Sequence, residues 1–179
     1  MTIRRINALL KQHDIIGWDI DRTLIAGPNS ELFREYVKRH PEKQHHLITF
    51  RSSQHDLDNM KYDLCFSDFS IDLFSGIHCV PADVGRSMYS YDPVHLSLAC
   101  HPDISDETFF RNTSMRNNRQ EMVRNLIAFN NFKPLKCREI GSGVLIDDMV
   151  RTLKDPCERH GVTLIDSCGD FSDHGVLTG

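Results

Sequence analysis

The sequence predicts an α/β protein in which a parallel β-sheet lies between two layers of helices, a three-layer Rossmann-like arrangement. Short apolar runs of strand length alternate with segments of helical period, which is typical of parallel sheets covered on both faces. Three of the apolar runs end directly in polar or acidic residues. Ligands bind at the carboxyl ends of the strands in such sheets, so these residues are candidates for a site. The 179 residues suffice for a single domain with a sizeable core.

The first half of the chain is expected to alternate helix and strand from its beginning. Ile3, Ile6 and Leu10 recur at helical spacing, which predicts a short amphipathic helix before the first strand. The predicted elements are a helix over 3–11, a strand over Ile15–Trp18, a helix over 31–39 capped by Ser30, a strand over 47–50, a helix that begins at Ser52 or Ser53 and runs towards Lys61, and a strand over 73–80.

The second half has one segment without a clear period, residues 82–115, which contains Gly85, Pro93, Pro102 and several serines. A structureless stretch of this length is uncommon inside a domain unless it is functional. The elements predicted after it are a helix over 115–129 capped by Ser114, a short strand or helical turn over 135–140, a strand over Val144–Asp147, a helix from Asp155 to Gly161, a strand over 162–165, and a loosely ordered tail over 167–179.

Asp19 and Asp21 directly follow the first apolar run, and Thr23 comes two residues later. Alternate residues at a strand end point the same way, so the two carboxylates are expected to lie close together. Two anions held together repel and normally need a cation between them. The alternative is an ordinary Asp-rich turn, because Asp is a common turn residue.

Two further runs end in groups suited to magnesium or phosphate. The run 144–146 leads into Asp147 and Asp148, and the run 46–48 leads into Thr49. With these residues the chain resembles the haloacid dehalogenase (HAD) superfamily of phosphotransferases. The first run matches its DxDxT motif, the run before Thr49 matches its hhhT motif, and the acid pair matches its strand-terminal Asp-Asp variant. The motifs occur in the family's order, and the resemblance covers roughly residues 15–167.

The resemblance implies roles for these residues. Asp19 matches the nucleophile that becomes an aspartyl phosphate, and Asp21 matches the general acid/base. Thr49 would hydrogen-bond a phosphoryl oxygen. A Mg²⁺ ion would be held by the Asp19 carboxylate, the Asp21 backbone carbonyl and one acid of the pair, for which Asp148 is favoured because it aligns with the usual ligand. Phosphoryl transfer depends on charge neutralisation and positioning, which suits such a site.

The family also uses a cation, usually lysine, to pair with the nucleophile and the phosphate. Lys136 is the first choice, because it lies 12 residues before Asp148, a spacing similar to that of deoxyribonucleotidase-like members. Lys133, followed by proline, resembles another form of the motif, but the gap to Asp148 looks too short for the helix that usually follows it. Arg116 is a third candidate. Each could equally be a solvated surface charge.

Substrate choice in this superfamily normally rests on cap insertions. Only 25 residues separate Thr23 from Thr49, too few for a helical cap domain. Residues 82–115 lie where the second cap type is inserted, so they are expected to form a small lid or a long loop at the mouth of the site. Tyr89, Tyr91 and His95 would stack on a substrate base or sugar there, or simply pack on the core. Arg51 would reach a substrate anion, or form a salt bridge at a strand end.

Composition narrows the alternatives. The net charge of −4 argues against a nucleic-acid binder, and no apolar run approaches the length of a membrane span. The six cysteines form no CxxC pair, which argues against zinc and favours reduced thiols in the cytoplasm. The leading hypothesis is a magnesium-dependent phosphatase, with a nucleotide as one small substrate; a transferase to another acceptor and a non-catalytic binding or regulatory protein are the alternatives. The oligomeric state is left open.

Overall fold

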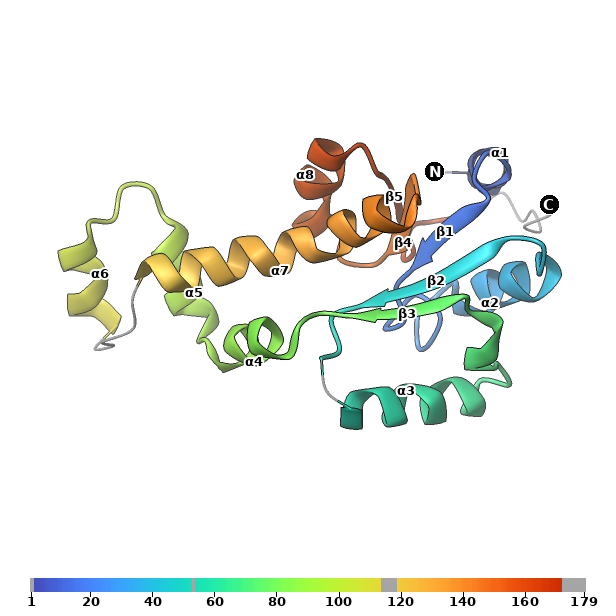
Figure 1. Ribbon diagram of the computed structural model, residues 1–179. Coiled ribbons are helices and arrows are strands. Elements are labelled where there is room, and N and C mark those ends of the chain that lie inside the picture. The colour runs from blue at the N-terminus through green and yellow to red at the C-terminus, as the bar shows by residue number, and fades with distance from the viewer. Residues whose placement is uncertain (1, 53, 114–118, 172–179) are drawn as a thin grey trace.

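The structure, a computed structural model, describes residues 2–52, 54–113 and 119–171. Within these residues the chain forms one parallel five-stranded sheet with the spatial order β3-β2-β1-β4-β5 (Figure 1). The strands are β1 (Ile15–Trp18), β2 (Gln44–Thr49), β3 (Gly76–Cys79), β4 (Val144–Asp147) and β5 (Thr163–Asp166). This order with helices on both faces is consistent with a Rossmann-like fold, so the predicted α/β parallel-sheet class is confirmed.

β1 is the central strand and pairs with two strands that lie far apart in the sequence. Trp18 is in register with Leu47 of β2 on one side and with Ile146 of β4 on the other. The chain first adds β2 and β3 on one side of β1 and then returns to add β4 and β5 on the other. The order of the strands therefore reverses between β1 and β4, and ligands bind at such a switch point in open α/β sheets.

Two separate cores cover the two faces of the sheet. One core contains Trp18, Phe33 and Leu47 and is covered by α1 (Ile3–Lys11), α2 (Ser30–Arg39) and α3 (Gln54–Phe66). The other contains Ile48, Leu145 and Leu153 and is covered by α4 (Ala82–Ser90), α7 (Arg119–Ile140) and α8 (Val150–His160). Burial of the strands on both faces explains why their sequences read as continuous apolar runs.

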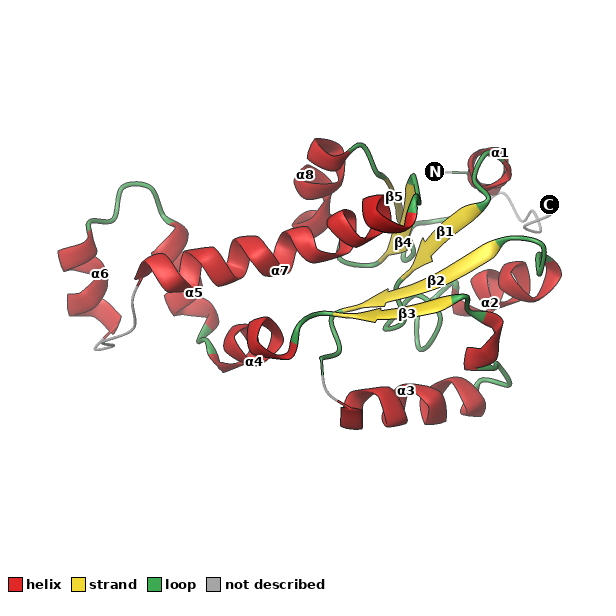
Figure 2. Cartoon of the chain, in the orientation of Figure 1, coloured by secondary structure: helices red, strands yellow, loops and turns green. Residues whose placement is uncertain are grey.

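The segment 82–113 is helical, which corrects the expectation that it has no regular structure. It forms α4, α5 (Pro93–Cys100) and α6 (Asp106–Thr113). α4 and α5 pack along α7, whose N-terminal part extends well beyond the sheet (Figure 2). A small third core between these helices contains the buried Ala99, Phe109 and Met122. The helices are only eight or nine residues long, too short to show a clear period in the sequence.

Several predicted boundaries also change. Residues 135–140 are the last part of α7, which continues through Pro134, and α8 begins at Val150 instead of Asp155. Ser30 does not cap α2; its hydroxyl accepts a hydrogen bond from the Gly27 amide, before the helix. The proposed caps Ser53 and Ser114 and the tail over 172–179 lie outside the described residues. Among the residues that the structure describes, no helix has both the length and the apolar character required to cross a bilayer.

Candidate active site

The ends of β1 and β4 bring two of the expected acids together. Asp19 follows β1 directly, and its backbone amide donates a hydrogen bond of 2.9 Å to the Ile146 carbonyl of β4. Asp147 is the last residue of β4. Both side chains are buried, at the point where the strand order reverses. The backbone pairing of the two strands therefore fixes how close these carboxylates come.

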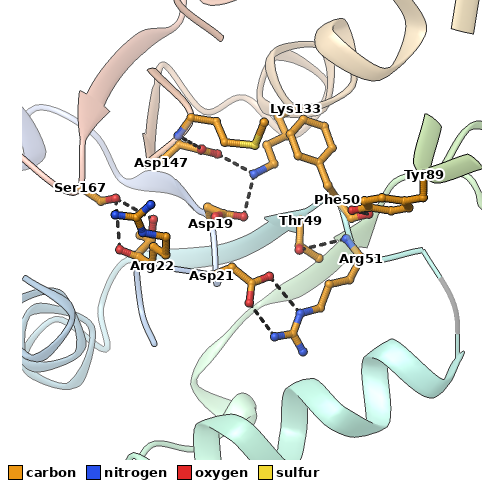
Figure 3. Close-up of polar contacts among 12 residues, drawn as sticks. Asp19, Asp21, Arg22, Thr49, Phe50, Arg51, Tyr89, Lys133, Asp147 and Ser167 are labelled. Atoms are coloured by element: carbon orange, nitrogen blue, oxygen red, sulfur yellow. Dashed lines mark hydrogen bonds and ion pairs between the residues drawn. The ribbon is translucent and has the colours of Figure 1, made fainter. Parts of the chain in front are cut away.

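Lys133 joins these two acids. Its Nζ donates hydrogen bonds of 2.6 Å to Asp19 Oδ1 and 2.6 Å to Asp147 Oδ2, as the close-up in Figure 3 shows. The ammonium also lies 4.3 Å from the centre of the Phe50 ring. Lys133 is among the largest fully buried side chains of the described chain. A buried lysine normally requires such paired charges, so its position depends on both carboxylates.

Burial and charge shift the proton affinities of this cluster. Burial raises the pKa of Asp19 to about 7; the charge of Asp147 adds to the rise, and Lys133 opposes it. Burial alone would lower the pKa of Lys133, but the charges of Asp147 and Asp19 raise it above its usual value. The lysine therefore stays charged, whereas one ammonium does not fully compensate the carboxylates around it.

A third acid, Asp148, borders the same cluster. Carboxylate oxygens of Asp19, Asp147 and Asp148 lie within 4.8 Å of one another. Burial and the charge of Asp147 raise the pKa of Asp148, while Arg22, at 3.8 Å, lowers it. Three acids with one internal ammonium leave a negative excess, and oxygen donors are the ligands that Mg²⁺ prefers. The donor set and its charge therefore fit a divalent cation.

Asp21 points away from this cluster towards a second cation. Arg51 donates from Nε and Nη2 to the two carboxylate oxygens of Asp21, at 3.0 and 2.7 Å, and from Nη2 to Asp63 of α3, at 3.0 Å (Figure 3). Hydrogen bonds to Asp21 and Asp63 raise the pKa of Arg51 above its usual value. The sequence left open whether Arg51 binds an anion or forms a salt bridge, and the structure places it in an ion pair.

Two threonines complete the polar side of the site. Thr49 is buried at the end of β2, and its Oγ1 accepts a 3.2 Å hydrogen bond from the Arg51 amide. Thr23 lies on the turn after β1, and its hydroxyl donates to Ser167 Oγ at 2.9 Å. Arg22 has a left-handed backbone conformation, with φ of 57°. The turn that contains Asp21 is thus held to the end of β5 by the hydrogen bond of Thr23.

Beside these groups lies a cavity of about 390 Å³, whose lining combines two chemical kinds of side chain. One set of lining residues is charged: Asp19, Asp21, Arg51, Lys133 and Asp148. The second set is aromatic or methionine: Phe50, Met88, Tyr89, Phe129 and Met149. Sequence reasoning missed most of the second set. Phe50 directly follows Thr49, and Phe129 ends the helix predicted over 115–129, but nothing in their spacing connects them to the acids.

The structure corrects the choice of cation. Lys136, the first choice, pairs with Glu139 on the outside of α7, and it does not line the cavity. Lys133 instead lies between Asp19 and Asp147 and lines the cavity. The gap to Asp148 is sufficient because Lys133 lies inside α7, about two turns before its end, and the chain needs no further helix. Arg116 lies outside the described residues.

The expected lid contributes one of its three rings to the cavity. Tyr89 of α4 lines it, and its hydroxyl donates to the Phe50 carbonyl at 3.4 Å. Tyr91 instead accepts a hydrogen bond from Asn125 of α7 and packs on the third core. His95 lies on α5 and does not line the cavity. The segment therefore reaches the site through α4 alone.

No protein-family model matches the chain, and searches of curated proteins and of solved structures found no match.

Proposed function

We propose that this protein is a HAD-type phosphatase, a magnesium-dependent phosphomonoester hydrolase that works through an aspartyl phosphate on Asp19. One observation carries the proposal. At the carboxyl edge of the sheet, the Lys133 ammonium lies between Asp19 and Asp147, and Asp148 lies beside them. This arrangement offers a nucleophile and a cation at the same point, and phosphoryl transfer requires positioning and charge neutralisation above all.

In the first half-reaction, a carboxylate oxygen of Asp19 attacks phosphorus and the bond to the leaving oxygen breaks. Lys133 holds Asp19 in place through its Oδ1 and remains positively charged beside the transferred group. Asp21 supplies the proton that the leaving oxygen takes up. Thr49, at the end of the neighbouring strand, is positioned to donate its hydroxyl proton to a phosphoryl oxygen.

In the second half-reaction, water attacks phosphorus and releases Asp19 as a free carboxylate with inorganic phosphate. Asp21, now without its proton, takes one from the attacking water and returns to its starting state. Each of these residues lines the same cavity. A Mg²⁺ ion held by Asp19, Asp148 and the Asp21 backbone carbonyl would neutralise charge on the phosphoryl oxygens.

The position of Asp21 favours a second candidate function. Arg51 occupies both carboxylate oxygens of Asp21, so proton transfer requires the Asp21 side chain to turn away from it. A protein in which this pair never opens would bind phosphorylated molecules without turning them over, as a binding or regulatory module. Transfer of the phosphoryl group to an acceptor other than water is the remaining alternative within the enzyme class, and product analysis distinguishes it.

A screen of phosphorylated metabolites, including nucleotides, with Mg²⁺ tests the proposal. The wild type should release phosphate, and chelation of Mg²⁺ should stop the release. Asp19→Asn should lower the rate at least about 10³-fold, because the nearly isosteric amide is no nucleophile. Asp103→Asn, an exposed site between α5 and α6, is the matched control. Beryllium fluoride should be trapped on Asp19 in the wild type and in Asp103→Asn but not in Asp19→Asn; normal turnover by a folded Asp19→Asn protein would exclude the mechanism.

A further inference from the structure

We propose that the organic group of the substrate is a flat ring, joined to the phosphate by a short link and seated against Tyr89. The inference rests on the proposed function and names the class of ester that its site would accept. It comes from the lining of the cavity, of which about half is charged or polar side chains and the other half is aromatic and methionine side chains.

Two of the rings form the fixed floor of this second half. Phe50 and Phe129 are stacked, with ring centres 3.9 Å apart and planes inclined by 13°. Phe50 also lies against the Lys133 ammonium, and both phenylalanines are buried. The packing of the protein therefore sets the positions of both rings. Through Phe50, this part of the cavity wall contacts the Lys133 ammonium beside Asp19.

Tyr89 has the opposite character. It is 68 % exposed although it lines the cavity. Its ring stands at 85° to the Phe129 ring with centres 6.3 Å apart, and its hydroxyl donates to the Phe50 carbonyl. These two contacts orient the ring. Figure 3 shows it at the side of the site away from the acids. A fixed ring with an open face at a cavity mouth is suited to stack on a second ring.

The apolar half also limits how a ring could be recognised. Of its five side chains, only Tyr89 carries a strong hydrogen-bonding group, and that hydroxyl is already bonded to the protein. A ring would therefore be selected by flatness and by contact with the methionines, not by polar groups on its edge. Phenyl groups and nucleobases share this chemistry, and purines and pyrimidines should be accepted about equally well.

Non-hydrolysable phosphonates allow the binding of the ring to be measured without turnover. We suggest calorimetric titration of the wild type, with Mg²⁺, against ethylphosphonate, 2-phenylethylphosphonate and 2-cyclohexylethylphosphonate. The phenyl compound should bind tightest, by about 2- to 12-fold over the cyclohexyl compound, which is the range of an aromatic pair beyond its buried area. Equal binding of the phenyl and cyclohexyl compounds would overturn the flat-ring proposal while leaving the phosphate site intact.

Variants at two equally exposed tyrosines locate the ring site. Tyr89→Leu should abolish the preference for phenyl over cyclohexyl, and Tyr89→Phe should keep it. Tyr62→Leu is the control, because Tyr62 of α3 is 64 % exposed but lies outside the cavity. A preference that survives Tyr89→Leu would show that the ring lies elsewhere and overturn the proposal. If none of the three phosphonates binds, the phosphate site itself is wrong, and the proposed function fails with the inference.

The source of the ring is decided by a last titration, of the Asp19→Asn variant against adenosine 5′-monophosphate, uridine 5′-monophosphate and phenyl phosphate. Nucleotides that bind more tightly than the phenyl ester, and that lose this advantage when Tyr89→Leu is added, identify the ring as a nucleobase. Equal or weaker nucleotide binding identifies a simple aryl ester. Nucleotide binding that is unaffected by Tyr89→Leu would contradict stacking on Tyr89.

Discussion

Two cations in this protein each lie between two carboxylates, yet in opposite surroundings. Lys133 pairs with Asp19 and Asp147, and the side chains of all three are at most 5 % exposed. Arg51 pairs with Asp21 and Asp63, whose side chains are 54 and 40 % exposed. The charges and distances are similar, so the comparison isolates the effect of burial.

The difference in exposure indicates which cluster can exchange its ion-pair partners. Water screens the Arg51 cluster and can replace any partner that leaves, so its ion pairs contribute little to stability. The Lys133 cluster is shielded from bulk water by its burial, so each charge there depends more strongly on the others. The buried cluster is thus suited to hold a fixed geometry, and the rim cluster is suited to open, as the proposed role of Asp21 requires.

The largest expected effect is that of removing the buried cation. Lys133→Met should lower the free energy of unfolding by about 3–5 kcal/mol at pH 8, because two buried carboxylates lose their partner. The deficit should shrink towards pH 5, where protons neutralise the acids. Urea unfolding at both pH values measures it.

Lys136→Met is the control for this variant, since Lys136 lies on the same helix and pairs on the surface. Equal losses from the two substitutions would contradict the special role of burial.

A second test separates the acids of the buried cluster by their affinity for Mg²⁺. Asp147 already accepts hydrogen bonds from Lys133 and from the Met149 amide, so it acts mainly by positioning its neighbours. Asp147→Ala should weaken Mg²⁺ by about 10- to 100-fold, as loss of an orienting group does. Asp148→Ala should weaken Mg²⁺ binding more, because it removes the proposed ligand. The reverse order in a calorimetric titration would identify Asp147 as the metal ligand.

The raised pKa of Asp19 predicts a pH effect on stability. The pKa of Asp19 is about 7 in the folded protein and 3.8 for a solvated carboxyl, so the folded state holds a proton that the unfolded chain lacks between about pH 4 and 7. Stability from this proton is present below pH 4 and is lost as the pH rises through 7. Without Mg²⁺, the free energy of unfolding of Asp19→Asn should therefore rise relative to that of the wild type by up to about 4 kcal/mol between pH 4 and 8. A constant difference across this range would exclude the burial effect.

The smallest effect is expected at the rim. Arg51→Met should change the free energy of unfolding by less than about 1 kcal/mol, because the cluster is partly solvated. It should leave turnover of a small phosphate ester within about tenfold of the wild type, since Asp21 becomes free to transfer protons. A loss of stability as large as that of Lys133→Met would show that the two clusters do not differ as their exposure implies.

The fold and the acids of the site were predictable because they follow from local patterns. Apolar runs gave the strands, and the carboxyl ends of parallel strands meet at one edge, which places Asp19, Thr49 and Asp147 together. The helices of 82–113 were not predictable, because short helices that pack on α7 show no clear periodicity. The sheet order that joins β1 to β4 is likewise set by tertiary packing, beyond what any local window contains.

For a related reason, the sequence did not predict that Lys133, rather than Lys136, lies beside the acids. Lys133 and Lys136 lie three residues apart on α7, so they differ by about 4.5 Å along the helix axis and point in similar directions. Which of the two lysines reaches Asp19 depends on the position of α7 along its axis relative to the sheet. The sequence does not specify that position. The pairing of Arg51 with Asp21 depends in the same way on the placement of α3, which contributes Asp63.

The central position of β1 has a consequence for the order of assembly during synthesis. β1 can pair with β2 early, but its other edge stays unpaired until β4 has left the ribosome, and 114 residues separate Asp19 from Lys133. Contacts of such sequence separation form slowly, and an open strand edge can associate with other chains in the meantime. Until α7 and β4 have been synthesised, Asp19 lacks its partner Lys133 and one edge of β1 stays unpaired. The site is therefore completed only after most of the chain has been made.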